Sequence, residues 1–295
     1  MVSWPELGTR VTVRFRRPPG SVPPLTDAVG HLLDVTPLVR VQTKSGGVVQ
    51  FAPEDVVALR MLSDTPVRAS EIRALEHAAA LACPGVEHHW LDGWLVRAGH
   101  GVTRTANSAV PLHFSANQTP IPLIADWYRR RGLTPRLAIP DRLLRLPDAG
   151  EHANWMLVRD VHTAEQDPLV QLSSHPDDEW LRHQDRAIPV DVLTAVIDGE
   201  LAFGRLANTA TARASVTAAP DGTHWVGVSQ VRTVDPGASR ELCEALLSWG
   251  AALGATRGYI RIPEDDRDAA ALVRSLGFVL HHEARYVTVT AESVT

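Results

Sequence analysis

The fold is decided by the stretch Ala271-Leu272-Val273-Arg274-Ser275-Leu276-Gly277-Phe278. Apolar residues recur in it at helical spacing, which predicts a helix over residues 268–276. Gly277 adopts left-handed backbone geometry at little cost, so it should end that helix. The run over residues 278–289 then has the pattern of a strand. A helix that passes through one glycine into a long strand therefore closes the chain.

Working back from this stretch, a second amphipathic helix is predicted over residues 240–253. Its apolar residues are three or four positions apart, and Gly254 ends it. They are Leu242, Ala245, Leu246, Trp249 and Leu253. A strand over residues 258–262 follows, and an antiparallel meander precedes the helix. The meander strands are predicted over residues 201–206, 211–218 and 224–233.

The whole segment 150–295 also includes a strand over 155–160 and helical stretches near 177–183 and 190–196, so its order is β-α-α-β-β-β-α-β-α-β. A shorter α-β-β-α-β set precedes it. Ser70 can cap its first helix, which Pro84-Gly85 stops. Its other elements are strands over 90–98 and 102–111, a helix over 122–131 and a strand over 135–139.

The first sixty residues have no helical period. Five β-rich runs are separated by turn signals, over residues 10–15, 29–35, 38–43, 48–51 and 56–62. So short an all-β segment must hide its strand edges, and the pattern resembles the SH3-like β-barrels. We expect an α+β protein with three modules: an SH3-like barrel (1–64), a front half (65–148) and a C-terminal half (149–295).

Composition excludes several classes of function. The chain has 295 residues and a formal net charge of −5, so no global positive field would draw it onto nucleic acid or anionic lipid. Cys83 and Cys243 are its only cysteines, which argues against a disulfide framework. With no signal-like start and no long apolar run, we expect a cytoplasmic protein without a membrane partner.

Several of these segments resemble the GNAT superfamily of acyl-CoA-dependent N-acetyltransferases. The closing block 271–278 is similar to the family's last helix and the Leu-Gly-Phe before its final hairpin. The helix over 240–253 and the strand after it are similar to the cofactor helix and its strand. Residues 90–97 and 103–135 resemble the degenerate front half of a tandem GNAT arrangement found mostly in actinobacteria. The resemblance covers roughly residues 70–290.

This resemblance implies that acetyl-CoA is the cosubstrate. Its pantetheine arm would pair with the strand over 224–233, and its pyrophosphate would rest at the start of the next helix. The implied contacts are Val231, Arg232, Thr233, Gly237, Ala238, Ser239 and Arg240. The family's glycine-rich loop is altered here, which leaves two interpretations. Either Asp235 replaces the central glycine, or the loop is shortened and Gly237 to Arg240 form the anion nest with Ser239 as the N-cap, which we favour slightly.

Catalytic residues of the family are also replaced. Val273 stands where a proton-donating tyrosine is usual, and Asp266 where an asparagine usually opens the last helix. The strand 225–233 has no glutamate to act as a base, so His224 is the one candidate, acting through water. We expect no metal site, because the neighbouring histidines His88-His89 and His281-His282 should point to opposite faces of their strands.

Two hypotheses follow. In the first, the protein is an N-acetyltransferase that moves acetyl from acetyl-CoA to a primary amine by direct attack in a ternary complex. In the second, it is an acyl-CoA-binding regulatory or adaptor protein with weakened catalysis. In either case the N-terminal barrel can recruit a protein partner. The sequence does not name the acceptor amine.

Overall fold

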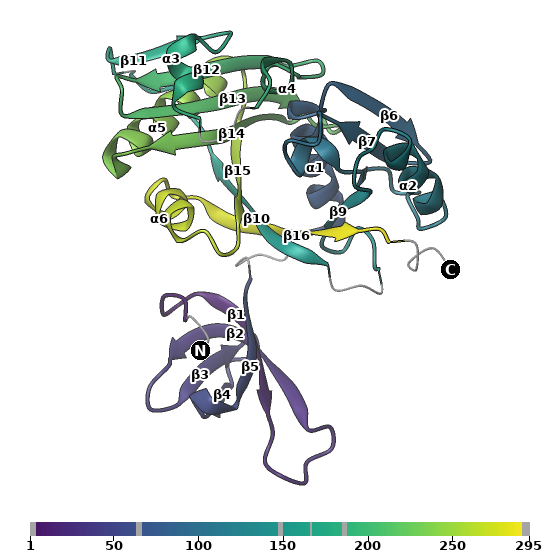
Figure 1. Ribbon diagram of the computed structural model, residues 1–295. Helices are drawn as coiled ribbons and strands as arrows, with labels where there is room; N and C mark the ends of the chain where they lie inside the picture. The colour runs from purple at the N-terminus through teal and green to yellow at the C-terminus, as the bar shows by residue number, and fades with distance from the viewer. Residues whose placement is uncertain (1–3, 63–66, 147–149, 166, 185–187, 291–295) are drawn as a thin grey trace. The chain divides into compact units, whose positions relative to one another are not determined.

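A computed structural model describes residues 4–62, 67–146, 150–165, 167–184 and 188–290 (Figure 1). The chain divides into two compact units, Met1–Val67 and Arg68–Thr295. Each unit has a core of its own, so we describe them separately.

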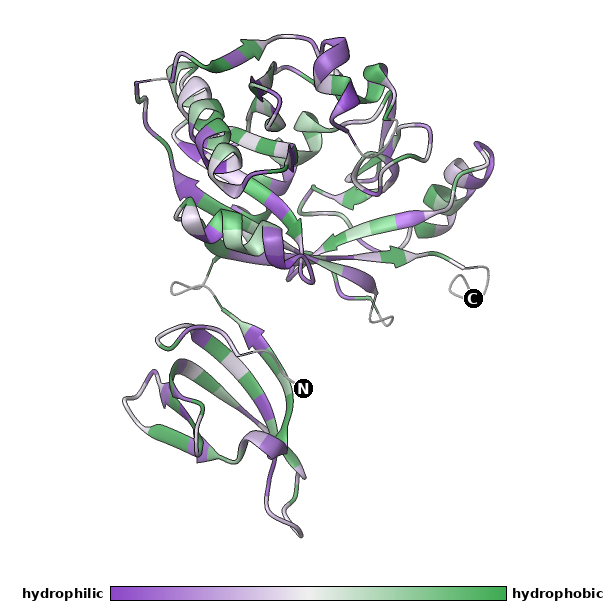
Figure 2. Ribbon diagram, turned by 60° about the vertical axis from the view of Figure 1, so that its left-hand side comes forward, coloured by the Kyte–Doolittle hydropathy of each residue, from purple (hydrophilic) through white to green (hydrophobic). Residues whose placement is uncertain are grey.

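The first unit is a five-stranded antiparallel sheet. Its strands are β1 (Arg10–Arg16), β2 (Leu25–Asp34), β3 (Val39–Thr43), β4 (Val48–Phe51) and β5 (Val56–Met61), in the spatial order β4-β3-β2-β1-β5. Buried and exposed residues alternate along β1, so hydrophobic and hydrophilic bands alternate along the ribbon (Figure 2). The inward residues include Val11, Val13 and Leu32, which pack with Phe51. The predicted small β domain is confirmed, with β2 starting four residues earlier than expected.

The second unit begins with the front half. Its elements are α1 (Ala69–Ala82), β6 (Glu87–Leu91), β7 (Trp94–Ala98), β8 (Val110–Pro111), α2 (Ile121–Arg129) and β9 (Arg136–Pro140). The single strand predicted over 90–98 was wrong, because Asp92 and Gly93 have positive φ and turn the chain into a hairpin between β6 and β7. The strand predicted over 102–111 was also wrong. Its first part is a loop with a short 3₁₀ turn, and only Val110–Pro111 pairs as a strand.

The C-terminal half follows the predicted order closely. Its strands are β10 (Glu151–Asp160), β11 (Val170–Ser173), β12 (Glu200–Leu206), β13 (Ala210–Ala218), β14 (His224–Thr233), β15 (Arg257–Pro263) and β16 (Val279–Thr288). Its helices are α3 (Asp178–Arg182), α4 (Val190–Leu193), α5 (Pro236–Ala252) and α6 (Arg267–Ser275). Strand β11 escaped prediction because it is short and half exposed.

The two halves share one local design. In the C-terminal half the antiparallel strands β12-β13-β14 lead through α5 to β15, which is parallel to β14. In the front half the antiparallel strands β6-β7-β8 lead through α2 to β9, which a parallel bridge between Ala109 and Leu137 joins to the end of β8. Strand β9 also pairs with β16 and so joins the eight-stranded sheet β11-β12-β13-β14-β15-β10-β16-β9. The order of elements from β6 to β9 thus resembles that from β12 to β15.

Helices cover both faces of the eight-stranded sheet. Leu157 of β10 packs in the same core as Leu242 of α5 and Val273 of α6. Its neighbour Met156 packs against Leu75 of α1. Since consecutive strand residues point to opposite faces, α5 and α6 lie on one face and α1 on the other.

Candidate functional site

Strands β14 and β15 separate partway along their length. They pair as parallel strands from Trp225 and Arg257 only as far as Val228 and Ile260. Beyond those residues β14 continues to Thr233 and β15 to Pro263, and the two ribbons diverge (Figure 1). The backbone of β14 from Ser229 onward therefore has an edge that β15 does not cover. Such an edge can accept an extended ligand as an additional strand.

A bulge in β14 lies at the same point. Its register against β13 passes from Arg213–Ser229 to Thr211–Arg232, so two β14 residues oppose one on β13. The first of them, Gln230, has φ +53°, an uncommon value for a non-glycine residue. Bulges bend a strand and locally increase its twist. The bulge thus accounts for the divergence of β14 from β15.

Helix α5 begins directly after this strand, and its start corrects one prediction. Asp235 is the N-cap, and its side chain accepts the Gly237 N–H at 2.9 Å. Ser239 was expected to be the N-cap, but it lies inside the helix and its hydroxyl donates to the Pro236 carbonyl at 2.8 Å. The helix starts four residues before residue 240 because Pro236 is compatible with the first helical position.

The structure brings most of the predicted donor-binding residues together. Val231 packs beside the α5 core, and Ala238 is buried in it. The Thr233 hydroxyl bonds to the backbone of Asp235, which ties the end of β14 to the start of α5. Arg232 is half-buried on β14, and Arg240 is exposed in the second turn of α5. These residues all follow the point where the strands separate.

His224 lies away from the predicted donor-binding residues. It opens β14 at the paired end, four residues and so about 13 Å before Val228. Its backbone carbonyl accepts the Thr256 N–H at 3.2 Å. This hydrogen bond lies at the paired end of β14 and β15. A surface hollow of about 550 Å³ lined by Asp160, His162 and Arg257 lies at this same end. The sequence candidate for the base is therefore not beside the divergent edge.

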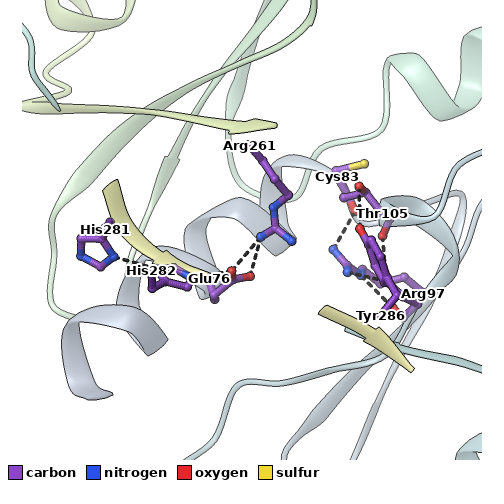
Figure 3. Close-up of polar contacts among 9 residues, drawn as sticks. Glu76, Cys83, Arg97, Thr105, Arg261, His281, His282 and Tyr286 are labelled. Atoms are coloured by element: carbon purple, nitrogen blue, oxygen red, sulfur yellow. Dashed lines mark hydrogen bonds and ion pairs between the residues drawn. The ribbon is translucent and has the colours of Figure 1, made fainter. Parts of the chain in front are cut away.

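A buried ion pair lies where the strands separate. Arg261 is the first β15 residue past the last pair with β14, and it is opposite Met156 of β10. Its Nη2 donates to both carboxylate oxygens of Glu76 on α1, at 2.8 and 2.7 Å (Figure 3). Glu76 is 2% exposed. On β16, the hydroxyl of Tyr286 lies 3.2 Å from that of Thr105 (Figure 3).

The pKa of Glu76 shows that this carboxylate is fully charged. Burial pushes its pKa upward, but the charge of Arg261 and the hydrogen bond from His282 outweigh burial and hold the pKa at about 2. Since Glu76 can only accept, the Nε2 of His282, at 2.8 Å, must donate. Sequence reasoning missed this group. Its one signal was a carboxylate on the apolar stripe of α1, four residues after Ile72.

His281 extends the network and corrects a second expectation. The register of β16 against β10 passes from Leu280–Leu157 to His282–Met156, so His281 is an extra, bulged residue. At this bulge the Nδ1 atoms of the two imidazoles lie 2.7 Å apart, within hydrogen-bond distance (Figure 3). The two side chains therefore do not point to opposite faces as predicted. Burial, with further contributions from His282 and Arg257, lowers the pKa of His281 to about 3.

The positions that depart from the family pattern have structural roles. Val273 is 3% exposed and packs in the α5–α6 core. Asp266 caps α6, accepting the Ala269 N–H at 2.9 Å. Among the described residues, no three His, Cys, Asp or Glu side chains gather in a way that could hold a metal ion. Nor does that part of the chain contain a helix long and apolar enough to span a membrane.

Comparisons with known proteins agree with this geometry. The chain matches a GCN5-related N-acetyltransferase from Kribbella flavida at a TM-score of 0.50 and 15% identity, covering 76% of this chain and 96% of that one. The fold is thus that of the GNAT class of N-acetyltransferases, with a small β domain in front. Residues 69–287 match the model "Probable histone acetyltransferase Rv0428c C-terminal", and residues 5–60 match the Rv0428c N-terminal Sm-like domain.

A curated relative matches almost the whole chain. It is the probable histone acetyltransferase Rv0428c of Mycobacterium tuberculosis, 60% identical over 294 residues, with 97% of each chain covered. The protein belongs to the Rv0428c family of acetyltransferases.

Proposed function

We propose that this protein is an N-acetyltransferase that moves the acetyl group of acetyl-CoA to a primary amine by direct attack in a ternary complex. The observation that carries the proposal is the divergence of β14 from β15 beyond Val228, with the bulge at Gln230 beside it. The two amides of a pantetheine arm can pair with the backbone edge of β14 over residues 229–233. This would set the thioester near the point of divergence.

The chemistry is an acyl transfer between two nucleophiles. The amine nitrogen attacks the thioester carbonyl carbon, a C–N bond forms and the C–S bond breaks. The products are the N-acetyl amine and the thiol, and the proton that the amine loses balances the one that the thiolate gains. Because a thiol has a pKa near 8.5, the thiolate can leave before it is protonated. A tyrosine at the position of Val273 is therefore not indispensable.

The amine has to lose its proton before it can attack. The Glu76 carboxylate is a poor acceptor because its pKa is about 2, and His281 is a poor one because its pKa is about 3. We propose that the amine reacts as its small neutral fraction and gives its proton to water. Turnover should then rise about tenfold per pH unit until the pH nears the amine pKa, with no plateau near pH 7.

The acceptor class follows from the relative's name. Since that protein is called a probable histone acetyltransferase, the lysine ε-amine of a basic polypeptide is the first acceptor to test. The net charge of −5 suits a cationic partner. The proposed modules 1–64, 65–148 and 149–295, the recruiting role of the first and a cytoplasmic location remain predictions.

The adaptor hypothesis has two observations in its favour. Val273 is buried where the family has a proton donor, and Asp235 puts a carboxylate at the start of α5. One experiment separates the two hypotheses: thiol release from acetyl-CoA is measured with a panel of amines and lysine peptides, beside calorimetric binding of acetyl-CoA. Amine-dependent release supports the transferase. Binding without release with any amine would support the adaptor.

A further inference from the structure

This inference concerns the acyl donor and rests on the proposed function. An acetyl-CoA molecule presents two ends that a protein can recognise. One is the acylated pantetheine arm, which carries two amides. The other is the adenosine end, which carries a diphosphate and attracts backbone N–H groups at a helix start. Each end can be compared separately with the groups that this chain offers.

The pantetheine end fits the chain. Strand β14 continues for five residues past its last pair with β15, and β13 covers only its other edge. The strained φ of Gln230 lies within this segment. Strain of about 1–3 kcal/mol at one residue is typical of ligand sites, where surrounding contacts maintain it.

The diphosphate end does not fit. A helix start offers its first N–H groups to an anion, but Pro236 has none. The Gly237 N–H already donates to Asp235 Oδ1 at 2.9 Å, and the Ser239 N–H donates to the Asp235 carbonyl at 3.1 Å. The Asp235 carboxylate thus takes up the Gly237 N–H, and its negative charge opposes the binding of a further anion beside the Ala238 N–H.

We propose that this protein selects its donor by the acylated pantetheine arm and leaves both phosphates of the diphosphate and the adenosine unrecognised. Short acyl thioesters of phosphopantetheine are then donors as good as acetyl-CoA, whether the arm is free or attached to a carrier protein. The reaction is the same acyl transfer, in which the C–N bond forms and the C–S bond breaks, and the thiol released is that of phosphopantetheine.

A donor series tests the proposal on the full chain with one lysine peptide as acceptor. The donors are acetyl-CoA, acetyl-4′-phosphopantetheine, acetyl-pantetheine and an acetylated holo-carrier protein. We expect kcat/KM for acetyl-phosphopantetheine to lie within about threefold of the value for acetyl-CoA, because the lost contacts are few. A preference for acetyl-CoA above about thirtyfold, or 2 kcal/mol, would overturn the proposal. Comparing kcat/KM for the acetylated carrier protein with that for free acetyl-phosphopantetheine shows whether a phosphopantetheine attached to a protein is the better donor.

A charge variant provides a second readout. Asp235→Asn keeps a capping oxygen but removes the charge, so kcat/KM for acetyl-CoA should rise about two- to fivefold while that for acetyl-pantetheine stays unchanged. Asp177→Asn is the matched control. Asp177 caps α3 in the same way, accepting the Trp180 N–H at 2.7 Å, and should leave the donor preference unaltered. Equal changes for all donors in Asp235→Asn would contradict the assignment.

If no donor is turned over, binding measurements test whether the chain recognises the diphosphate end. In that case the proposed function fails, while calorimetry with CoA and free 4′-phosphopantetheine still compares the two ends. Affinities within about threefold support the inference. Much tighter CoA binding, or no binding of either compound, overturns it.

Discussion

Glu76 joins three elements of the unit 68–295. It links α1 to β15 and β16 through Arg261 and His282, and nearly all of its surface is buried. A buried charge is tolerated only when partners compensate its lost hydration. The Glu76–Arg261 pair also marks the point where β14 and β15 separate, so the network supports the site as well as the core.

Replacing this carboxylate should be costly. Glu76→Gln leaves the Arg261 charge buried without a counter-ion, so we expect a loss of about 3 kcal/mol in the free energy of unfolding. Urea denaturation followed by tryptophan fluorescence measures it. Glu87→Gln is the control, because its ion pair with Arg131 is exposed and should contribute less than about 1 kcal/mol. Similar losses in the two variants would show that the buried pair has no special role.

His281 should make stability depend on pH. Its pKa falls from 6.5 to about 3 on folding, so the unfolded chain binds more protons between these values. The contribution of His281 to the free energy of unfolding is therefore fully present above pH 6.5. It falls at lower pH, with a slope approaching about 1.4 kcal/mol per pH unit. Glu76 adds a loss in the same direction, but only below about pH 4.5.

The measurement compares unfolding free energies at pH 7.5 and 5 in wild type and His281→Asn. The asparagine amide can still donate to His282, but it does not titrate. The variant should therefore lose the pH-dependent part of the unfolding free energy that comes from residue 281. His88→Asn, at an exposed position, should keep the wild-type slope. A variant His281→Asn with the full wild-type slope would exclude His281 as its source.

At the scale of elements, contact between α5 and β14 sets the geometry of the site. Gly250 lies where the helix meets the strand, and a Cβ there would lie 2.4 Å from Cβ of Val226. Gly237, in the first turn of the same helix, has only Asp235 nearby, at 3.5 Å or more. The two glycines of α5 thus have opposite surroundings.

These surroundings predict opposite effects of alanine. In a free helix Gly→Ala stabilises by up to about 1 kcal/mol, and Gly237→Ala should show part of that gain. At Gly250 overpacking costs about 1–3 kcal/mol and exceeds the gain, so Gly250→Ala should destabilise and push α5 away from β14. Thermal unfolding of both variants tests this. A stabilised Gly250→Ala would mean that the helix and strand are less closely packed than described.

At the scale of the whole molecule, the two units are independent in their cores. The inward residues of the small β domain, such as Val13 and Leu32, pack with one another, while the groups of the candidate site all belong to residues 68–295. The front half contributes α1, and with it Glu76, to the candidate site.

Removal of residues 1–67 should therefore leave donor binding and turnover with a small amine within about twofold of the full chain. The comparison uses kcat/KM for acetyl-CoA, with circular dichroism to confirm folding. A folded truncated chain that has lost donor binding would show that the β domain completes the site. If only turnover of a polypeptide acceptor falls, the domain recruits that acceptor.

The sequence by itself determined the elements whose signals are local. Helical spacing, the glycines that end helices and alternating strands predicted α6, β16 and most of α5, and with them the GNAT resemblance. The turn at Asp92-Gly93 is also a local signal, although the β6–β7 hairpin around it was predicted as one strand.

Only the tertiary structure decided which groups meet. Glu76 and His282 are 206 residues apart, and their contact depends on α1 covering the sheet and on a bulge at His281. The bulge at Gln230 likewise depends on how β14 pairs with β13. Short-range patterns fix which residues face a core, but bulges and buried ion pairs depend on register and packing between distant segments, which no local pattern records.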